Sequence, residues 1–558
     1  MRIRTAGCVL SVLAIAYAAM SAWSPAGAES YQRISGEGSS WAANAIDAMR
    51  VNVKQFGITV DYNPSGSSAG RKDWLNGTVD FAASDIPFQF HPEDGSAPEN
   101  PQPDSYAYIP VTAGGTSFMY NLKINGQRVT NLRLSGQNVA KIFTGAVTKW
   151  NDPAIAADNP GLTMPDRTIV PVVRSDGSGS TAQFTRWMIH QYGDIWTAYC
   201  NKSGRAPACG FTSNYPTIPG MIAQSGDLGI AGYVSQNFAE GAIGYVNYSY
   251  ALNTQFPVAK VLNAAGYYTE PTPQNVAVSL LKARINFDKS SEDYLTQILD
   301  DVYTDTDNRN YQLSSYSYFI LPTKVQGQFN NEKGKTLGAF TYYAMCQAQQ
   351  QSASLGYSPL PVNLVQASLD QIKKIPGVQV ENIDISKCNN PTFSPDGTNV
   401  LARDAPQPQA CDKQGPTQCA VGTGGQKKQS TTVKASASGG SSGGSGTGGS
   451  SSSSGRATSG GSASASSSTG SGSSVAAAAA SCDPSLGPCD SSTGALELAD
   501  GGSSNGSGTA VGDQVTTVLT GSRGWGTTQS LIVFVALLTL ALLIIPPIAW
   551  QRFSGSRR

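Results

Sequence analysis

The chain has 558 residues and a formal net charge of +0, with only 14% charged residues, so bulk charge gives no reason to expect nucleic acid as a partner. It contains 9 cysteines and 2 histidines, and no CxxC motif occurs, so a zinc site is not expected. This length exceeds that of one ordinary domain, and the composition changes sharply along the chain.

The first segment is typical of a secretory signal peptide. Residues 1–28 place two arginines before an apolar run that ends in the small-residue sequence AGA, so cleavage is expected before Glu29. Cys8 precedes the apolar run instead of ending it, so lipidation of this cysteine is not expected.

Two segments near the N-terminus each place a loop of serine and glycine before a helix. Residues 35–41, SGEGSSW, lead into an amphipathic helix. Residues 65–70, SGSSAG, follow an alternating strand and begin a second helix. A further short strand, residues 79–83, then leads to Asp85.

The third and most informative stretch is residues 171–192, PVVRSDGSGSTAQFTRWMIHQY. A short buried strand ends at Val173, a Ser/Gly loop that begins with Arg174 follows, and apolar residues recur at helical spacing from Thr181. The helix start presents unpaired N–H groups and the arginine adds a rigid fork of donors, which suits a tetrahedral oxyanion. One such loop is equally compatible with an ordinary helix cap. Three loops of this kind, each before a helix, predict that the helix N-termini converge on an anion.

Strands and helices alternate through the chain, which predicts an α/β architecture. We expect a strand at residues 108–120 to cross between two lobes near residues 114–115, and the buried strand at residues 241–246 to be a return crossing. Anion sites in such sheets lie beyond the carboxyl ends of the strands, where these loops fall.

The last quarter of the chain has a different composition. Residues 421–526 are mostly serine, glycine and alanine and predict a flexible linker. Residues 527–551 include an uncharged apolar run that is long enough to cross a bilayer, and residues 552–558 form a basic tail that predicts a cytoplasmic C-terminus. A wall-sorting signal is the alternative, but its LPxTG motif is missing.

Cysteine usage indicates an oxidising compartment. Local spacing suggests three pairs, which are Cys200 with Cys209, Cys411 with Cys419, and Cys482 with Cys489. Cys346 and Cys388 remain, and the sequence alone leaves the connectivity open.

Several separated motifs, in the right order, resemble the phosphate-binding proteins of the phosphate-specific ABC transport system. SGEGSSW is similar to the family's GAGATF, SGSSAG to its GSSGG loop, VDFAASDIPF to VDFGASDAP, and VRSDGSGST to R-x-DGSGTS. The blocks TGAVTKWNDPAIAADNPGL and GAIGYVNYSYA also fit the family. The resemblance covers about residues 31–419.

The resemblance implies a set of phosphate-binding positions, which are Ser40, Trp41, Ser67, Asp85, Arg174, Asp176, Ser178, Gly179 and Ser180. It gives Asp85 the role of accepting the phosphate proton, Arg174 that of binding oxygen, and Asp176 that of orienting the arginine. Trp41 would contribute its backbone N–H while its ring packs in the core. Glu37 replaces a small residue near the site.

The resemblance further implies a two-lobed, periplasmic-binding-protein-like (type II) α/β fold with a hinge over residues 29–420. We expect lobe I at residues 29–115 and 250–420 and lobe II at residues 116–249.

The function implied is capture of inorganic phosphate for uptake by an ABC permease, by a binding protein that is not an enzyme and uses no cofactor. It would lie on the extracellular face of the cell membrane, held by one membrane-spanning helix. A surface anion sensor or adhesion protein with the same fold is one alternative. A serine hydrolase or phosphatase is another, because residues 66–70 match GxSxG, but only His91 and His190 could serve as its base.

Overall fold

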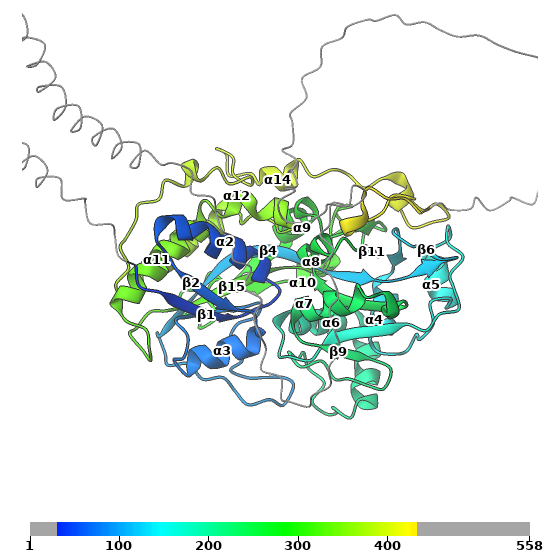
Figure 1. Cartoon of the computed structure of the whole chain (residues 1–558), viewed down its shortest axis with the longest axis horizontal. Helices are drawn as coiled ribbons and strands as arrows, with labels where there is room; N and C mark the ends of the chain where they lie inside the picture. Colours follow the sequence, from blue (N-terminus) through cyan, green and yellow to red (C-terminus); the bar gives the residue numbers. More distant parts are fainter. Residues whose placement is uncertain (1–30, 432–558) are drawn as a thin grey trace, which may run out of the picture. The chain divides into compact units, whose positions relative to one another are not determined.

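The computed structural model describes residues 31–431 (Figure 1). The expected signal peptide, most of the expected linker, the membrane segment, and Cys482 and Cys489 lie outside the described residues. Within residues 31–431, no helix combines the length and the apolar character that a membrane span requires.

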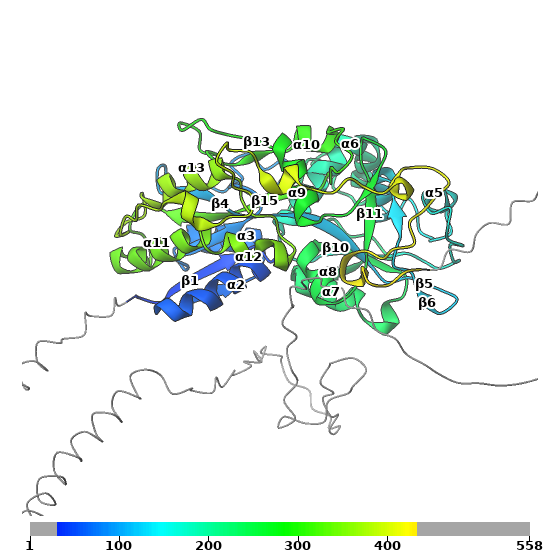
Figure 2. The ribbon, with the colours of Figure 1, turned by 90° about the horizontal axis from the view of Figure 1, so that it is seen from above.

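One continuous sheet runs through both halves of the described domain (Figures 1 and 2). Its main path, in spatial order, is β2 (Val60–Asn63), β1 (Ile34–Gly38), β3 (Phe81–Ser84), β15 (Ser314–Pro322), β4 (Tyr106–Tyr120), β10 (Ala242–Asn247), β8 (Val170–Arg174) and β9 (Ile222–Gln224). The side branch consists of β7 (Arg133–Leu134), β11 (Val258–Leu262) and β12 (Tyr268–Thr269). β10 and β15 are buried along their whole lengths, as expected for strands that helices and loops cover on both faces.

The long strand β4 belongs to both halves of the sheet. It pairs with β15 up to Gly115, opposite Ser314, and with β10 from Thr116, opposite Asn247. The strand therefore passes from lobe I to lobe II within the sequence Gly115-Thr116, next to the diglycine in the expected crossing region. Gly115 must lack a side chain here, because a Cβ atom would lie 2.2 Å from Cβ of Pro271.

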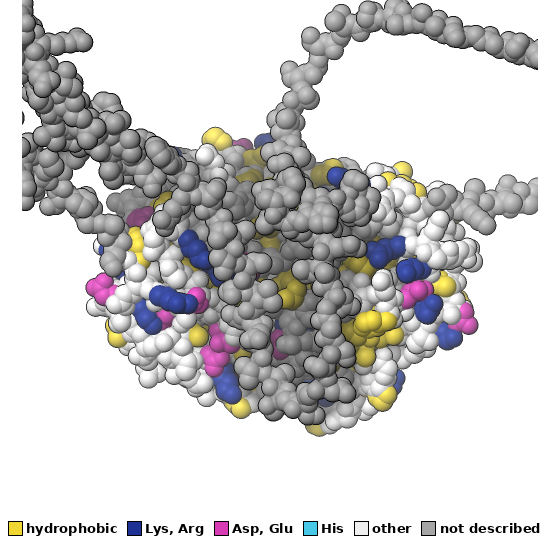
Figure 3. Space-filling model, viewed as in Figure 1, with side chains coloured by type: hydrophobic (Ala, Val, Ile, Leu, Met, Phe, Trp, Pro, Cys, Tyr) yellow, Lys and Arg dark blue, Asp and Glu magenta, His cyan; other side chains and the backbone are white. Residues whose placement is uncertain are grey.

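Helices cover both lobes. The longer helices of lobe I are α2 (Ala43–Val53), α3 (Ser67–Leu75), α11 (Asn331–Met345) and α13 (Val362–Ile372). Those of lobe II are α4 (Gly136–Phe143), α5 (Pro153–Asp158), α6 (Gly179–Lys202), α7 (Gly226–Val234) and α8 (Tyr248–Asn253). The coloured part of the surface in Figure 3 shows lysine and arginine side chains interspersed with those of aspartate and glutamate. This agrees with the equal numbers of basic and acidic residues in the sequence.

The structure corrects the expected return to lobe I at residue 250. Strand β10 lies between β4 and β8 inside lobe II, so it is not a return crossing. After α8, strand β11 pairs with β4 at Phe118 and Met119 and with β7, which keeps the chain in lobe II. The reason is that the lobe II part of β4 can pair with a strand on each of its two edges. β10 pairs with one edge, and β11 pairs with the other.

The structure also corrects the start of the linker, which was expected at residue 421. Residues 421–431 pack on lobe II: the backbone N–H of Val258 donates to Oγ1 of Thr423 at 3.1 Å, and that of Thr130 donates to Oγ1 of Thr431 at 2.9 Å. An earlier residue of the same C-terminal segment also packs on lobe II, since Nη1 of Arg133 donates to the Thr417 carbonyl at 2.8 Å. Composition missed this because polar side chains, not apolar ones, hold the segment in place.

Three disulfides are present within the described residues. They join Cys200 to Cys209, Cys346 to Cys388, and Cys411 to Cys419. The pairs that local spacing suggested are therefore confirmed for Cys200 with Cys209 and for Cys411 with Cys419, and Cys346 and Cys388, whose partners the sequence left open, pair with each other.

Candidate anion-binding site

The three Ser/Gly loops meet where the lobes face each other. The N–H of Gly66 donates to the Gly38 carbonyl at 2.8 Å, which joins the first two loops within lobe I. The N–H of Ser68 donates to the Gly177 carbonyl of lobe II at 3.0 Å. A Cβ atom on Gly179 would lie 2.6 Å from Oγ of Ser67, so the loops touch across the interface.

Helix starts contribute serine hydroxyls to this place. Oγ of Ser178 accepts from the N–H of Thr181 at 3.1 Å and so caps α6, and it lies 2.8 Å from Oγ of Ser180. In the first loop, Oγ of Ser39 accepts from the N–H of Ala42 at 3.1 Å, just before α2. The positive ends of these helix dipoles favour negative charge between them.

Arg174 ends β8 and is only 2% exposed. Its Nε donates to Oδ1 of Asp176 at 2.8 Å, which gives the charged pair that the resemblance implies. Its Nη1 donates to Oδ2 of Asp227 at 2.6 Å and to Oγ of Ser180 at 3.3 Å. Burial lowers the pKa of Arg174, but the two carboxylates outweigh it and hold the pKa above its ordinary value.

Asp85 follows β3 and is also buried. Its Oδ1 accepts from the hydroxyls of Ser39 at 2.6 Å and Ser317 at 2.8 Å, and its Oδ2 accepts from Ser67 at 3.3 Å. Burial raises the pKa of Asp85 above its ordinary value even though these hydroxyls favour the charged form.

Asp227, at the start of α7, is a site residue that sequence reasoning missed. Its Oδ2 accepts from Ser40 of lobe I at 2.7 Å as well as from Arg174, and its Oδ1 accepts from the N–H of Asn247 at 2.7 Å. The carboxylate therefore bridges the lobes, and burial raises its pKa. The available signal was the sequence Ser225-Gly226-Asp227, a fourth polar loop between a strand and a helix.

The sequence profile described as the PBP superfamily domain matches residues 24–347 of the chain. The phosphate-binding protein PstS of Pasteurella multocida is 31% identical over 315 residues, which are 56% of this chain and 81% of that protein. PstS of Haemophilus influenzae is 30% identical over 320 residues, 57% of this chain and 86% of that protein. The chain belongs to this phosphate-binding protein family. A solved phosphate-binding protein of Stenotrophomonas maltophilia is 19% identical, with a TM-score of 0.45, over 60% of this chain and 92% of that one.

Membership of a family of binding proteins argues against the hydrolase alternative, and the geometry offers it no support. Oγ of Ser68, the GxSxG serine, accepts from Nη2 of Arg71 at 3.4 Å. His190 lies on α6 beside Asp300, with Nε2 4.0 Å from the carboxylate. Within residues 31–431, no group of His, Cys, Asp and Glu side chains could hold a metal ion.

The side chains of Trp41 and Glu37 lie outside the cluster of charged and hydroxyl groups described above. The ring of Trp41 is buried, with its Nε1 donating to Oγ1 of Thr116 at 3.1 Å, so it packs in the core as expected. Oε1 of Glu37 accepts a hydrogen bond from Nδ2 of Asn63 at 2.9 Å, outside the cluster of Asp85 and Arg174.

Proposed function

We propose that this chain captures inorganic phosphate outside the cytoplasm and hands it to an ABC permease. The observation that carries the proposal is the buried guanidinium of Arg174, which lies beside Ser180 at the start of α6 and faces the lobe I loops that carry Ser67 and Asp85. Rigid forked donors, hydroxyls and helix N-termini are the groups that bind a tetrahedral oxyanion.

Phosphate would lie between the two lobes and draw donors from both. We assign the contacts to the positions that the family pattern gives, which are Ser40, Trp41, Ser67, Asp85, Arg174, Ser178, Gly179 and Ser180, with Asp176 orienting Arg174. Nη2 of Arg174 donates one N–H to Asp176, and its second N–H would bind a phosphate oxygen. The hydroxyls and helix N–H groups would bind the other oxygens, and Asp85 would accept the proton of the ligand. Hinge closure of the lobes would then enclose the ligand.

The chain would carry out this function while tethered to the outer side of the cell membrane. The cleaved signal at residues 1–28 would export the domain, the segment 527–551 would hold it, and the basic tail would remain in the cytoplasm. Tethering would keep captured phosphate close to a permease in the same membrane.

Isothermal titration of the purified protein with phosphate, sulfate and molybdate tests the proposal. We expect phosphate to bind more tightly than sulfate, and Arg174→Lys to weaken phosphate binding by about tenfold or more, because a single ammonium cannot reproduce the fork of donors. Lysine is preferred to alanine here, since a buried and unpaired Asp227 would cost about 3–5 kcal/mol of stability.

Arg167→Lys is the matched control, because Arg167 also belongs to lobe II but lies exposed against Glu240 at 3.0 Å. Its affinity for phosphate should equal that of the wild type. Failure of the wild type to bind phosphate would reject the proposed function, and equal losses in the two variants would remove Arg174 from the site.

A further inference from the structure

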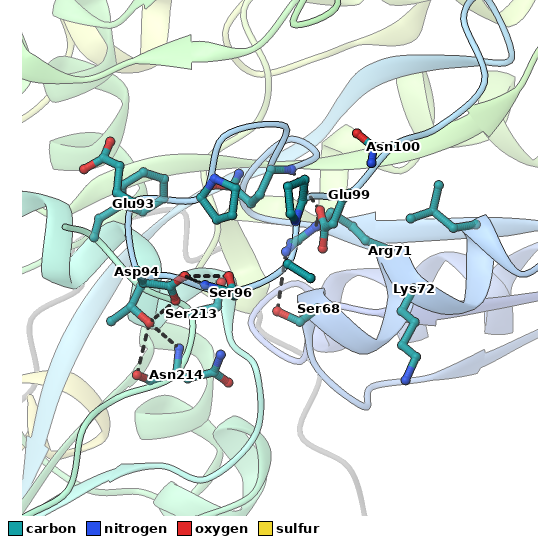
Figure 4. Close-up of a pocket in the computed structure, with 17 residues that line it drawn as sticks. Ser68, Arg71, Lys72, Glu93, Asp94, Ser96, Glu99, Asn100, Ser213 and Asn214 are labelled. Atoms are coloured by element: carbon teal, nitrogen blue, oxygen red, sulfur yellow. Dashed lines mark hydrogen bonds and ion pairs between the residues drawn. The ribbon is translucent and has the colours of Figure 1, made fainter. Parts of the chain in front are cut away.

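The segment between β3 and β4 leaves lobe I and reaches lobe II. Residues 91–99 of this segment, which we name the latch loop, lie beside residues 211–214 at a cleft of about 350 Å³ (Figure 4). Ser68 and Arg71 of lobe I line the same cleft, so it borders the second Ser/Gly loop of the anion site.

The latch loop contacts lobe II at three points. Oγ1 of Thr212 donates to Oδ2 of Asp94 at 2.6 Å, and Nη2 of Arg205 donates to the Asp94 carbonyl at 3.0 Å. Glu93 lies directly against Gly210, where an added Cβ atom would stand 2.1 Å from Cβ of Glu93. The Asp94 side chain is only 7% exposed, so these contacts are shielded from water.

At its other end the latch loop is bound to the anion-site loops of lobe I. Nε of Arg71 donates to Oε2 of Glu99 at 2.7 Å, and the Arg71 side chain is 2% exposed. The same guanidinium donates to Oγ of Ser84 at 2.9 Å and to Oγ of Ser68 at 3.4 Å. Ser68 and Ser84 are the direct chain neighbours of Ser67 and Asp85.

The lobe II end is bound to the start of α6 in the same way. The N–H of Ser178 donates to the Ser213 carbonyl at 2.9 Å, and the N–H of Thr212 donates to Oγ1 of Thr185 on α6 at 3.0 Å. The disulfide between Cys200 and Cys209 closes the loop that precedes these residues. Each end of the latch is thus one or two contacts away from the groups assigned to phosphate.

We propose that the latch loop fastens the two lobes together and sets how slowly phosphate leaves, an inference that rests on the proposed function. Its contacts with Arg205, Gly210 and Thr212 cross from one lobe to the other, so opening of the lobes breaks them. Asp94 and Arg205 are positioning residues: they lie outside the anion site and act through the closure of the lobes. Their loss therefore accelerates release and leaves the encounter with phosphate unchanged.

Stopped-flow measurement of phosphate association and release by the full chain tests this inference. Asp94→Ala and Gly210→Ala should each raise the release rate about tenfold or more. The first removes a buried charge-assisted hydrogen bond, and the second places a Cβ atom where it clashes with Glu93 and forces the latch loop away from lobe II. Association rates should stay within twofold of the wild type. Asp94→Asn, which keeps an acceptor for Thr212, should restore much of the slow release.

Gly193→Ala is the matched control, since a Cβ atom at this lobe II position meets nothing within 4 Å. It should release phosphate at the wild-type rate. The double variant Asp94→Ala/Thr212→Val should release phosphate no faster than Asp94→Ala alone, because the two substitutions remove the same hydrogen bond.

Tight phosphate binding with unchanged release in Asp94→Ala and Gly210→Ala would overturn the latch while leaving the proposed function intact. Equal changes in the association and release rates, without rescue by Asp94→Asn, would also overturn it. Absence of phosphate binding by the wild type would reject both.

Discussion

At the scale of the residue, the proposed function makes Asp85 the group that would decide which anion the site accepts. Near neutral pH phosphate carries at least one proton and sulfate carries none. A carboxylate can accept a hydrogen bond from protonated phosphate, whereas it repels a bare sulfate oxygen, and unpaired buried polar groups cost roughly 1–3 kcal/mol. The serine hydroxyls around Asp85 can donate a hydrogen bond to either anion, so they supply no preference for phosphate.

We therefore expect Asp85→Asn to narrow the difference in affinity between phosphate and sulfate by roughly tenfold or more, because the amide can donate to sulfate. Isothermal titration of both anions against wild type and variant measures the difference. Full selectivity in the variant would show that another acceptor is responsible. Asp227 would then be the first residue to test, since its carboxylate contacts both Ser40 and Arg174, whereas Glu37 lies outside the cluster.

Asp85 also gives the folding stability a dependence on pH. Burial raises its pKa in the folded state, so the folded protein binds this proton more tightly than the unfolded chain does. The favourable contribution is fully present below the unfolded pKa of about 3.9, and it is lost as the pH rises through the raised folded value.

Asp85→Asn should remove this contribution. Urea unfolding at a series of pH values between about 4 and 7 should show that the free energy of unfolding falls more steeply with pH in the wild type than in the variant. Parallel curves would mean that Asp85 titrates alike in the folded and unfolded chains.

At the scale of the element, the C-terminal segment decides where the folded domain ends. The hydroxyl of Thr423 accepts from the N–H of Val258, and the N–H of Gly425 donates to the Phe256 carbonyl at 2.9 Å. These bonds attach residues 421–431 to β11 and the turn before it.

A chain that ends at residue 420 should therefore be less stable than one that ends at residue 431, by roughly 2–4 kcal/mol for the few hydrogen bonds lost. Denaturant unfolding of the two truncated proteins gives the comparison. Equal midpoints and slopes would contradict the assignment of residues 421–431 to the folded domain, and would return the linker boundary to residue 421.

At the scale of the whole molecule, the proposed phosphate site and the proposed membrane anchor fall in separate parts of the sequence. The loops and side chains assigned to the site, together with Asp227 and Ser317, lie within lobes I and II and end well before residue 431. Truncation before Leu531 should therefore release the protein from the membrane fraction with its affinity for phosphate unchanged.

Fractionation of cells that express each form, followed by phosphate titration of the released protein, measures both outcomes. Retention of the truncated protein in the membrane would show a second anchor and would bring Cys8 back into consideration. Reduced affinity of the released form would show that the tail contributes to the site.

The sequence alone determined the local parts of this protein. The Ser/Gly loops, the helix starts that follow them, and Arg174 and Asp85 at the ends of two strands could all be identified before the structure. This succeeded because helix capping and strand endings depend on residues that are close together in the chain. The pairing of Cys200 with Cys209 could be predicted for the same reason.

Tertiary structure alone decided what these parts meet. Ser40 and Asp227 are 187 residues apart, and Asp85 and Ser317 are 232 residues apart, yet each pair shares a buried hydrogen bond. No local pattern indicates such partners, because the pairing of β15 with β3 and the packing of the two lobes bring them together. The latch loop and the C-terminal segment were missed for a related reason: polar contacts hold both, and composition records only whether a segment can bury apolar surface.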